Sequence, residues 1–559
     1  MRRPLLFLFL ALALVAAGLG AGAQSLAFRP LTDELLRNPP PGDWPMWRRT
    51  YSGWGYTPLD QIDTKNVGSL QLAWSFGMGT GRSEPTPIVA NGIMFLASPN
   101  DLLHALDAAT GELIWEYRRP IHAGETSFQR NVAVYEDSVF MATADAHIVS
   151  LDARTGQVRW DSPVADTKKG YNYSSGPIIV KGKVITGIAG CSRLYGEGCF
   201  ITAHDAKTGK ELWRTFTIAR PGEPGGDSWG NLPMQRRGGG EVWLPCSYDP
   251  ALDLLYCGVA QAKPWAAASR GLTIKDAALY TLSTLAMNPD TGKIVWYYQY
   301  VPGETLDMDE NYAHVLVDRG GTRALLEFGK HGVLWKIDRE TGRFISHREL
   351  VKQNIFEHID PKTGAVTYSP AIVPQIGKEV FQCPSHGNTS WISPAYHPGE
   401  GLHFLPISRN CISFTALAVQ TGEGQGGSGA RRAMKLMPGV DEVGELAAID
   451  VDSMTVKWSH QQRAPFVSGL VTTGGGLVFA GDLNRYFRAF DAKTGKILWE
   501  TRLPASAGGA ATSYAVNGQQ YVAVPTGRSS IGDLLAGILP DIKIPPSANG
   551  VHVFKLPAP

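Results

Sequence analysis

The sequence lacks several features that mark common classes of protein. It has no excess charge of either sign, because 52 Lys and Arg residues stand against 51 Asp and Glu residues, so nothing indicates a nucleic-acid partner. It contains only six cysteines and no C-x-x-C-H sequence, so no c-type haem is expected on the chain. Beyond the first 20 residues no stretch is apolar enough to cross a bilayer, and we expect no stable membrane insertion. What remains is a chain of 559 residues with 63 Gly and 37 Pro, a composition typical of a turn-rich β protein.

Residues 1–23 have the pattern of a secretory signal peptide. Two arginines precede an apolar run from Leu5 to about Gly20, and small residues then form an A-x-A cleavage site that ends at Ala23. The run is short for a membrane-spanning helix. We therefore expect export, with cleavage near Ala23.

Because disulfides persist in oxidising compartments, export leads us to expect that the six cysteines form disulfides. One pair is placed symmetrically about a predicted hairpin turn, a second could close a short loop, and a third could close a longer one. In that order the pairs are Cys246–Cys257, Cys191–Cys199 and Cys383–Cys411. The alternative is that these cysteines are buried free thiols.

A short pattern recurs along most of the chain. In each copy an Asp or Asn is followed three residues later by Thr or Ser and eight residues later by Trp. In most copies a Gly follows the Thr and can adopt positive φ, and alternating apolar residues flank the turn, so each copy predicts a β-hairpin. The tryptophans of these copies are Trp115, Trp160, Trp213, Trp296, Trp458 and Trp499.

Two weaker copies extend the set to eight. Ser346 stands at the Trp position of a degenerate copy, and Trp74 lacks a preceding Asp-Thr-Gly. Strand-rich repeats of roughly 40–50 residues predict an all-β, eight-bladed β-propeller in which a flat Trp packs between neighbouring blades. A closed ring of eight blades can accommodate a chain of this length in one domain, so we expect a single domain over residues 24–559. The Gly-rich segment 420–439 is expected to be a mobile surface loop.

Two further segments give these repeats a family resemblance. DWPMWRRTYSGWGYTPLDQIDTKNVGSLQLAWSF (43–76) and TSYAVNGQQYVAVPTG (512–527), together with the repeats, resemble the quinoprotein alcohol dehydrogenases, which use pyrroloquinoline quinone (PQQ). The similarity covers nearly the whole mature chain. It implies a periplasmic enzyme that oxidises a small-molecule alcohol and passes electrons to a separate acceptor such as a cytochrome c.

The resemblance also implies a set of cofactor contacts. PQQ is a flat tricyclic quinone with three carboxylates, so its site requires cations and an aromatic surface. The family's Gly-Gly-Gly-x-x-Trp floor matches GGGEVW at Trp243, its Asn-Arg motif matches Arg130, and Lys330 occupies the position beside the quinone oxygens. Taken singly, each could be an ordinary structural or solvated residue. Further contacts are expected from Glu84, Ser174 and Trp391.

The family's general base is an Asp five residues after a Pro, which places the base at Asp307. The metal ligands match less well. Gln261 replaces an Asn, Asp309 resembles the extra acid of lanthanide-using members, and the family's Glu ligand has no counterpart in register, so that Glu197 is the nearest carboxylate. We expect Ca²⁺ bound by Gln261, Asp307, Asp309 and Glu197, with a lanthanide as the alternative.

Other departures concern the shape of the funnel. Gly124-Glu125 replaces an adjacent cysteine pair, and Ser390-Trp391 replaces an Asn-Trp. These changes favour a bulkier substrate, for which a hydroxylated sesquiterpenoid toxin is one analogy among the family's alcohols. The competing interpretation is a non-enzymatic propeller scaffold of the outer-membrane assembly type, but Gln24 stands where such proteins carry a lipid-attachment Cys. A polysaccharide-acting propeller would need paired carboxylates, and the sequence identifies no such pair.

Overall fold

The computed structural model describes residues 28–121, 129–546 and 548–558. The expected signal peptide (1–23) and the Gly124-Glu125 position lie outside the described residues. Strands dominate, and the α-helices in the described part are short: α1 (Asp33–Arg37), α2 (Ala267–Arg270) and α3 (Ser530–Ala536). The prediction of an all-β chain is therefore confirmed. Within the same residues, no helix has the length and apolarity that a membrane crossing requires.

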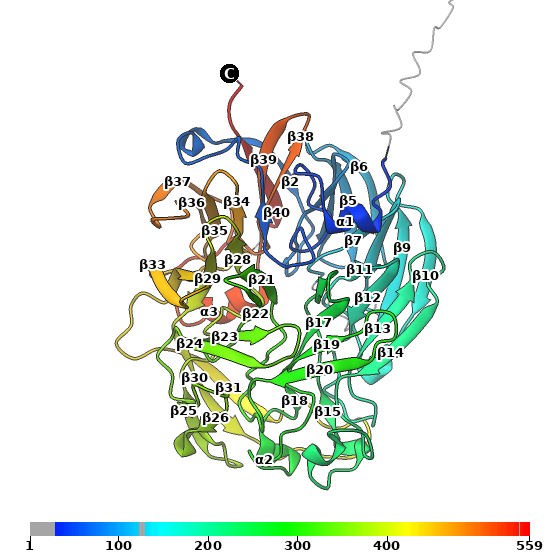
Figure 1. Ribbon diagram of the computed structural model, residues 1–559, viewed down its shortest axis with the longest axis vertical. Helices are drawn as coiled ribbons and strands as arrows, with labels where there is room; N and C mark the ends of the chain where they lie inside the picture. Colours follow the sequence, from blue (N-terminus) through cyan, green and yellow to red (C-terminus); the bar gives the residue numbers. More distant parts are fainter. Residues whose placement is uncertain (1–27, 122–128, 547, 559) are drawn as a thin grey trace, which may run out of the picture.

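In the described part of the chain, seven four-stranded sheets and one five-stranded sheet follow one another around the molecule in chain order (Figure 1). The first four sheets contain β3–β6 (Ile88–Ala90, Ile93–Ser98, Leu102–Asp107, Leu113–Arg118), β7–β10 (Ala133–Tyr135, Ser138–Ala142, His147–Asp152, Val158–Pro163), β11–β14 (Ile178–Val180, Lys183–Gly187, Phe200–Asp205, Glu211–Phe216), and β16, β17, β19 and β20 (Ser247–Asp249, Leu254–Val259, Ser283–Met287, Ile294–Gln299).

The other four sheets complete the circuit. They contain β21–β24 (Val315–Arg319, Thr322–Phe328, Val333–Asp338, Phe344–Glu349), β28, β29, β32 and β33 (Ala395–His397, Leu402–Ser408, Gly444–Asp450, Thr455–Gln462), β34–β37 (Val471–Thr473, Leu477–Gly481, Tyr486–Asp491, Ile497–Arg502) with β1 (Tyr56–Thr57), and β38–β40 (Thr512–Val516, Gln519–Thr526, Gly550–Lys555) with β2 (Gln71–Gly77).

The last of these sheets joins the two ends of the chain. Strand β40 lies between β39 and β2, and β2 pairs with it antiparallel from Gln71↔Lys555 to Gly77↔Gly550. The inner strands are buried, whereas outermost strands such as β6 alternate between exposed and buried residues. Alternation is the signature of a strand with one face on the core.

The outermost strand of one sheet contacts the turn of the next through its Trp. Trp115 in β6 lies on Gly156, where a Cβ atom would stand 2.6 Å from the indole ring, and its Nε1 donates to the Ala153 carbonyl at 3.0 Å. Gly156 has φ +70°, so the turn needs glycine both for its conformation and for the space. The same contact joins Trp74 with Gly111, Trp160 with Gly209, Trp213 with Gly292, Trp296 with Gly342, and Trp458 with Gly495.

The Asp or Asn at the start of each repeat stabilises its turn through the side-chain oxygen. In the first copy Asp107 Oδ1 accepts hydrogen bonds from the backbone N–H groups of Ala109 and Thr110 at 2.9 Å and from the Thr110 hydroxyl at 3.1 Å. This Asx turn explains the fixed spacing of Asp, Thr and Gly.

All six cysteines lie in the described residues and form the three expected disulfides, with none left free. The Cα atoms are 5.6 Å apart in Cys191–Cys199, 4.5 Å in Cys246–Cys257 and 4.4 Å in Cys383–Cys411, all within the range of ordinary disulfides.

Smaller sheets and α2 lie together on one side of the molecule, at the bottom of Figure 1. They are β15 (Gly238–Gly239) with β18 (Ala262–Lys263), β25 (Phe356–Ile359) with β26 (Val366–Tyr368), and β27 (Glu379–Gln382) with β30 (Asn410–Ala416) and β31 (Ala430–Leu436). Strand β31 corrects one expectation, because it lies within the Gly-rich segment that was expected to be a loop. Its register with β30 runs from Asn410↔Leu436 to Ala416↔Ala430.

Candidate active site

The loop between β20 and β21 carries Asp307 and Asp309, and its own residues fix its shape. The Glu304 carboxylate accepts hydrogen bonds from the backbone N–H groups of Leu306 at 2.5 Å and Met308 at 3.0 Å. Asp307 and Asp309 both have positive φ, +67° and +42°, which a side chain adopts only when its surroundings enforce it. The two carboxylates are thus held in an unusual, well-determined loop.

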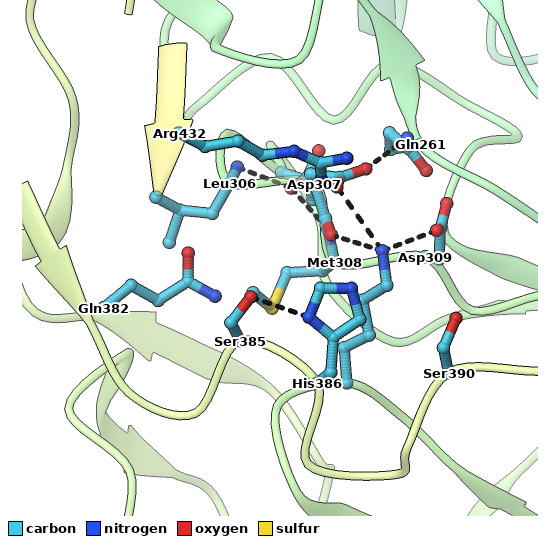
Figure 2. Close-up of polar contacts among 12 residues, drawn as sticks. Gln261, Leu306, Asp307, Met308, Asp309, Gln382, Ser385, His386, Ser390 and Arg432 are labelled. Atoms are coloured by element: carbon cyan, nitrogen blue, oxygen red, sulfur yellow. Dashed lines mark hydrogen bonds and ion pairs between the residues drawn. The ribbon is translucent and has the colours of Figure 1, made fainter. Parts of the chain in front are cut away.

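Side chains from three distant segments converge on Asp307 (Figure 2). Gln261 Nε2 donates to Oδ1 at 2.5 Å, Arg432 Nη1 pairs with Oδ2, and Lys330 Nζ lies 3.4 Å from Oδ2. Lys330 also donates to the Asp307 carbonyl at 3.0 Å and to Asp309 Oδ2 at 2.7 Å. Both carboxylate oxygens of Asp307 therefore have donors, and Lys330 ties the two acids together.

Burial and neighbouring charges shift the pKa values of Asp309 and Lys330. Burial raises the pKa of Asp309 to about 6, although Lys330 opposes the rise. Burial alone would lower the pKa of Lys330, but the carboxylates of Asp307 and Asp309 outweigh it and raise the pKa above its usual value. Lys330 is thus held as an ammonium between two acids.

A second ion pair extends the cluster through Lys263 in β18. Its Nζ donates to Glu241 Oε2 at 3.0 Å, while Glu241 Oε1 accepts from the Gly190 N–H at 3.0 Å. Burial opposes the charge on Lys263, but Glu241, Asp307 and Asp309 together raise its pKa. Neither Lys263 nor Glu241 was predicted from the sequence. The sequence held one indication of Lys263. This residue lies two positions after the candidate ligand Gln261, in a segment expected to bind a cation.

The other half of the site is built on Arg130, which lies three residues before the start of β7. Its guanidinium pairs with Glu84 Oε2 at 2.7 Å, donates to the Ser174 carbonyl at 2.9 Å, and lies over the rings of Trp243 at 5.2 Å and Trp391 at 5.5 Å. Four of the expected cofactor contacts thus meet Arg130 itself, although Ser174 contributes its backbone carbonyl rather than its hydroxyl.

Tyr312 and the first turn of α3 contact the residues around Arg130. Trp243 packs edge to face on Tyr312, three residues after Asp309, with ring centroids 5.6 Å apart. Glu84 Oε1 accepts hydrogen bonds from both the N–H and the hydroxyl of Ser530, each at 2.6 Å. The aromatic floor and the acidic loop therefore belong to one continuous site.

Glu197 is the expected ligand that the structure does not bring to the cluster. Its side chain is 40% exposed, and its carboxylate pairs with Lys169 and accepts a hydrogen bond from the Tyr171 hydroxyl at 3.3 Å. Glu241, joined to the cluster through Lys263, is the glutamate whose contacts lead to Asp307 and Asp309.

The radial sheets and this buried charged site define a β-propeller of the PQQ-dependent dehydrogenase class. The model of the family "PQQ: Glucose/ethanol/alcohol dehydrogenase, beta-propeller domain" matches residues 44–352 and 440–522, more than half of the chain. The chain belongs to this family of alcohol-oxidising, PQQ-dependent oxidoreductases. The unmatched stretch between the two matches includes β25–β27 and β30–β31.

Similar proteins support this assignment. The quinohemoprotein alcohol dehydrogenase ADH-IIG of Pseudomonas putida is 33% identical over 542 residues, which cover 89% of this chain and 74% of that protein. The quinoprotein alcohol dehydrogenase PedH of P. putida is 31% identical, covering 90% of this chain and 89% of its own. Among solved structures, a europium-containing methanol dehydrogenase superposes with a TM-score of 0.87 at 28% identity, covering 94% of this chain and all of that one.

The residues of the site fit PQQ. Arg130 Nε and Trp391 Nε1 are buried and have no hydrogen-bond partner among the described residues, and a guanidinium beside an indole face suits a flat polyanion. Gln261 Oε1 and Asp309 Oδ1 are likewise buried without a partner in the described part of the chain, and oxygen donors of this kind suit a hard cation. However, no group of three or more His, Cys, Asp or Glu residues within the described ranges could hold a metal by itself. A metal here would need the Gln261 amide and non-protein oxygens as well.

Proposed function

We propose that this chain oxidises an alcohol to an aldehyde or ketone, with Asp307 as the general base. The observation that carries the proposal is the placement of Asp307, a buried carboxylate bound by Gln261, Lys330 and Arg432 in the same site as the Arg130–Trp243 pair. A carboxylate in this position can accept the proton of a substrate hydroxyl group. PQQ, when bound, supplies the acceptor for the hydride that leaves the carbinol carbon.

The remaining residues have binding and orienting roles in this proposal. Trp243 offers its indole face to the planar cofactor, and Arg130 offers its guanidinium to a cofactor carboxylate, with Glu84 holding the guanidinium in place. The Ser174 carbonyl accepts a hydrogen bond from the Arg130 guanidinium, and the Trp391 ring packs against it. Lys330 keeps its ammonium beside Asp307, where it contacts one carboxylate oxygen and donates a hydrogen bond to the backbone carbonyl.

We further propose a metal ion at this site, Ca²⁺ with a lanthanide as the alternative. Gln261, Asp307 and Asp309 would hold it through their oxygens. Glu197 could join them only by leaving its ion pair with Lys169. Relatives named as lanthanide-dependent, such as the methanol dehydrogenase of Methylorubrum extorquens at 31% identity, make the choice of ion worth testing.

The finer features of substrate, partner and location are part of the same proposal. A bulky secondary alcohol, such as a hydroxylated sesquiterpenoid toxin, is the proposed substrate, and an external cytochrome c the electron acceptor. The chain would act in the periplasm after cleavage near Ala23. No observation favours the scaffold alternative, since a scaffold has no need for charged side chains gathered around a buried aspartate.

We also propose that the eight large sheets are the blades of one closed propeller domain that spans residues 24–559. Three observations support a closed ring: the order of the sheets, the Trp–Gly contacts between successive sheets, and the sheet shared by β2 and β38–β40. An experimental structure with a different number of blades would refute this part alone.

The function is tested by loading the protein with PQQ and either Ca²⁺ or a lanthanide and following dye reduction over a panel of primary and secondary alcohols. Asp307→Asn should lower turnover by about 10²–10⁴-fold, because the general base is lost, while cofactor binding and the unfolding transition persist. Asp318→Asn, at an exposed acid in β21, is the matched control and should keep full turnover. Dye reduction that survived in the Asp307 variant would show that another group is the base.

A further inference from the structure

The side chain of Arg432 differs from the other partners of Asp307 in its exposure and in its origin. It is 31% exposed, whereas Lys330 is only 3% exposed and Gln261 is fully buried. It comes from β31, in the stretch that the family model does not match. Arg432 therefore stands at the solvent side of the charged group, on a strand that lies outside the residues matched by the family model.

The position of Arg432 is fixed by contacts at the start of β31. The Ser428 carbonyl accepts from the Trp265 N–H at 2.8 Å, and the Gly429 carbonyl accepts from the Ser269 hydroxyl at 3.2 Å. The Arg432 guanidinium lies 4.3 Å from the centre of the Trp265 ring. Figure 2 shows the side chain reaching from its strand toward Asp307 above Leu306. The ion pair is thus presented by an anchored strand rather than by a free loop.

An alcohol that is to give its proton to Asp307 needs one of the two carboxylate oxygens. Oδ1 is taken by Gln261, and Oδ2 is shared by Lys330 and Arg432. Lys330 is buried and has two further acceptors, Asp309 and the Asp307 carbonyl, so it is held in place. Arg432 is the partner that can be displaced, because its side chain already reaches solvent and keeps the Trp265 ring as a support.

We propose that Arg432 is a specificity-determining residue, whose guanidinium yields Asp307 Oδ2 to the substrate hydroxyl and donates to a second oxygen of the substrate. This inference rests on the proposed function of Asp307. A guanidinium fork spans two oxygens that lie close together, as in a carboxylate. The preferred substrates are therefore alcohols with an ether, carbonyl or carboxylate oxygen on the carbon next to the carbinol. Such an oxygen replaces the acceptor that Arg432 loses, whereas a plain alcohol leaves the guanidinium without one.

The test uses two substrates of equal size that differ in one atom. In trans-2-methoxycyclohexanol an ether oxygen stands where trans-2-ethylcyclohexanol has a methylene group. The PQQ-loaded wild type should favour the methoxy compound in kcat/KM by about tenfold or more, as expected for a hydrogen bond to a charged group. Arg432→Ala should bring the ratio close to one, and Arg432→Lys should keep part of it, since it retains the charge without the fork. Arg431→Ala is the control, because Arg431 is exposed and neighbouring side chains of a strand point to opposite faces.

A binding measurement separates this inference from the proposed function. The ketones 2-methoxycyclohexanone and 2-ethylcyclohexanone are titrated into the PQQ-loaded protein, and tryptophan emission is followed with Trp265→Phe as the reference for the Trp265 signal. Wild type should bind the methoxy ketone more tightly and change its Trp265 emission, and Arg432→Ala should lose both effects. An unchanged substrate ratio in Arg432→Ala, or equal affinity of wild type and Arg432→Ala for the methoxy ketone, would overturn the inference. If the wild type oxidised no alcohol, the proposed function would fail, and the titration would still decide the role of Arg432.

Discussion

The turns of the sheets and the site around Asp307 use aspartate in opposite ways. In the turns, each Asp accepts hydrogen bonds from groups two and three residues ahead, remains near the solvent, and recurs from sheet to sheet. At the site, Asp307 is buried, and its partners Gln261 and Arg432 lie 46 and 125 residues away in the chain. Local interactions repeated many times can each be lost at small cost, whereas long-range interactions that occur once carry the chemistry. A single substitution should therefore cost little in a turn and much more at the site.

The largest change in stability is expected at the buried ion pair of Arg130 and Glu84. Glu84→Ala leaves a buried guanidinium without its carboxylate, which should lower the free energy of unfolding by about 3–5 kcal/mol. Urea unfolding measures it. The double variant Glu84→Ala/Arg130→Ala should recover part of the loss, since no unpaired charge remains. If Glu84→Ala lowered the free energy of unfolding by less than 1 kcal/mol, the interactions of the site would be no more costly to lose than those of the turns.

The second effect concerns pH and Glu304, whose carboxyl group holds the loop that carries Asp307. Burial raises the pKa of Glu304 to about 7, from 4.5 for an ordinary Glu. The folded state thus binds this proton more tightly than the unfolded state does. The contribution of Glu304 to stability is therefore most favourable below about pH 4.5, falls as the pH rises toward 7, and stays reduced above it. The rise corresponds to about 3 kcal/mol.

Glu304→Gln removes this titration while keeping an oxygen that can accept from Leu306 and Met308. Between pH 5 and pH 8 the variant should gain stability relative to the wild type by up to about 3 kcal/mol. Unfolding curves at the two pH values, recorded for both proteins, give this difference directly. Parallel pH dependence in the two proteins would show that Glu304 does not titrate in this range.

The smallest effect is expected in a single turn of a sheet. Gly156→Ala places a methyl group against Trp115 at a residue with φ +70°, which should cost about 1–3 kcal/mol through overpacking in addition to the backbone strain. Gly222→Ala is the matched control, because Gly222 also has positive φ but has no atom within 4 Å of the added position. The difference in unfolding free energy between the two variants isolates the Trp contact. Turnover should be unchanged in both, and a loss of turnover in Gly156→Ala would mean that the turns and the site are coupled.

The same contrast explains what the sequence could predict. The spacing of Asp, Thr, Gly and Trp reports interactions within a dozen residues, so strands, turns and the Trp positions could be read from it. The disulfides Cys246–Cys257 and Cys191–Cys199 also close short loops. Family motifs located Asp307, Arg130 and Trp243, because each lies in a segment with a recognisable local pattern.

The rest of the site depends on which distant segments meet. Arg432 lies in a Gly-rich stretch whose composition indicated a loop, but this stretch forms β31, and its pairing with β30 and its contacts near Trp265 bring Arg432 to Asp307. Glu197 was selected for its closeness in sequence to a missing ligand, yet its nearest cation is Lys169. Glu241 lies next to Lys263 because β15 pairs with β18, a contact that no local pattern reveals.

The position of β40 between β2 and β39 has a consequence for how the molecule is made. The segment that begins at Gln71 emerges from the ribosome long before its partner strand β40, which ends at Lys555. A nascent chain therefore cannot complete this sheet until translation has reached Lys555. Proteolytic removal of β40 would also leave β2 without its partner strand, although the two are far apart in the sequence.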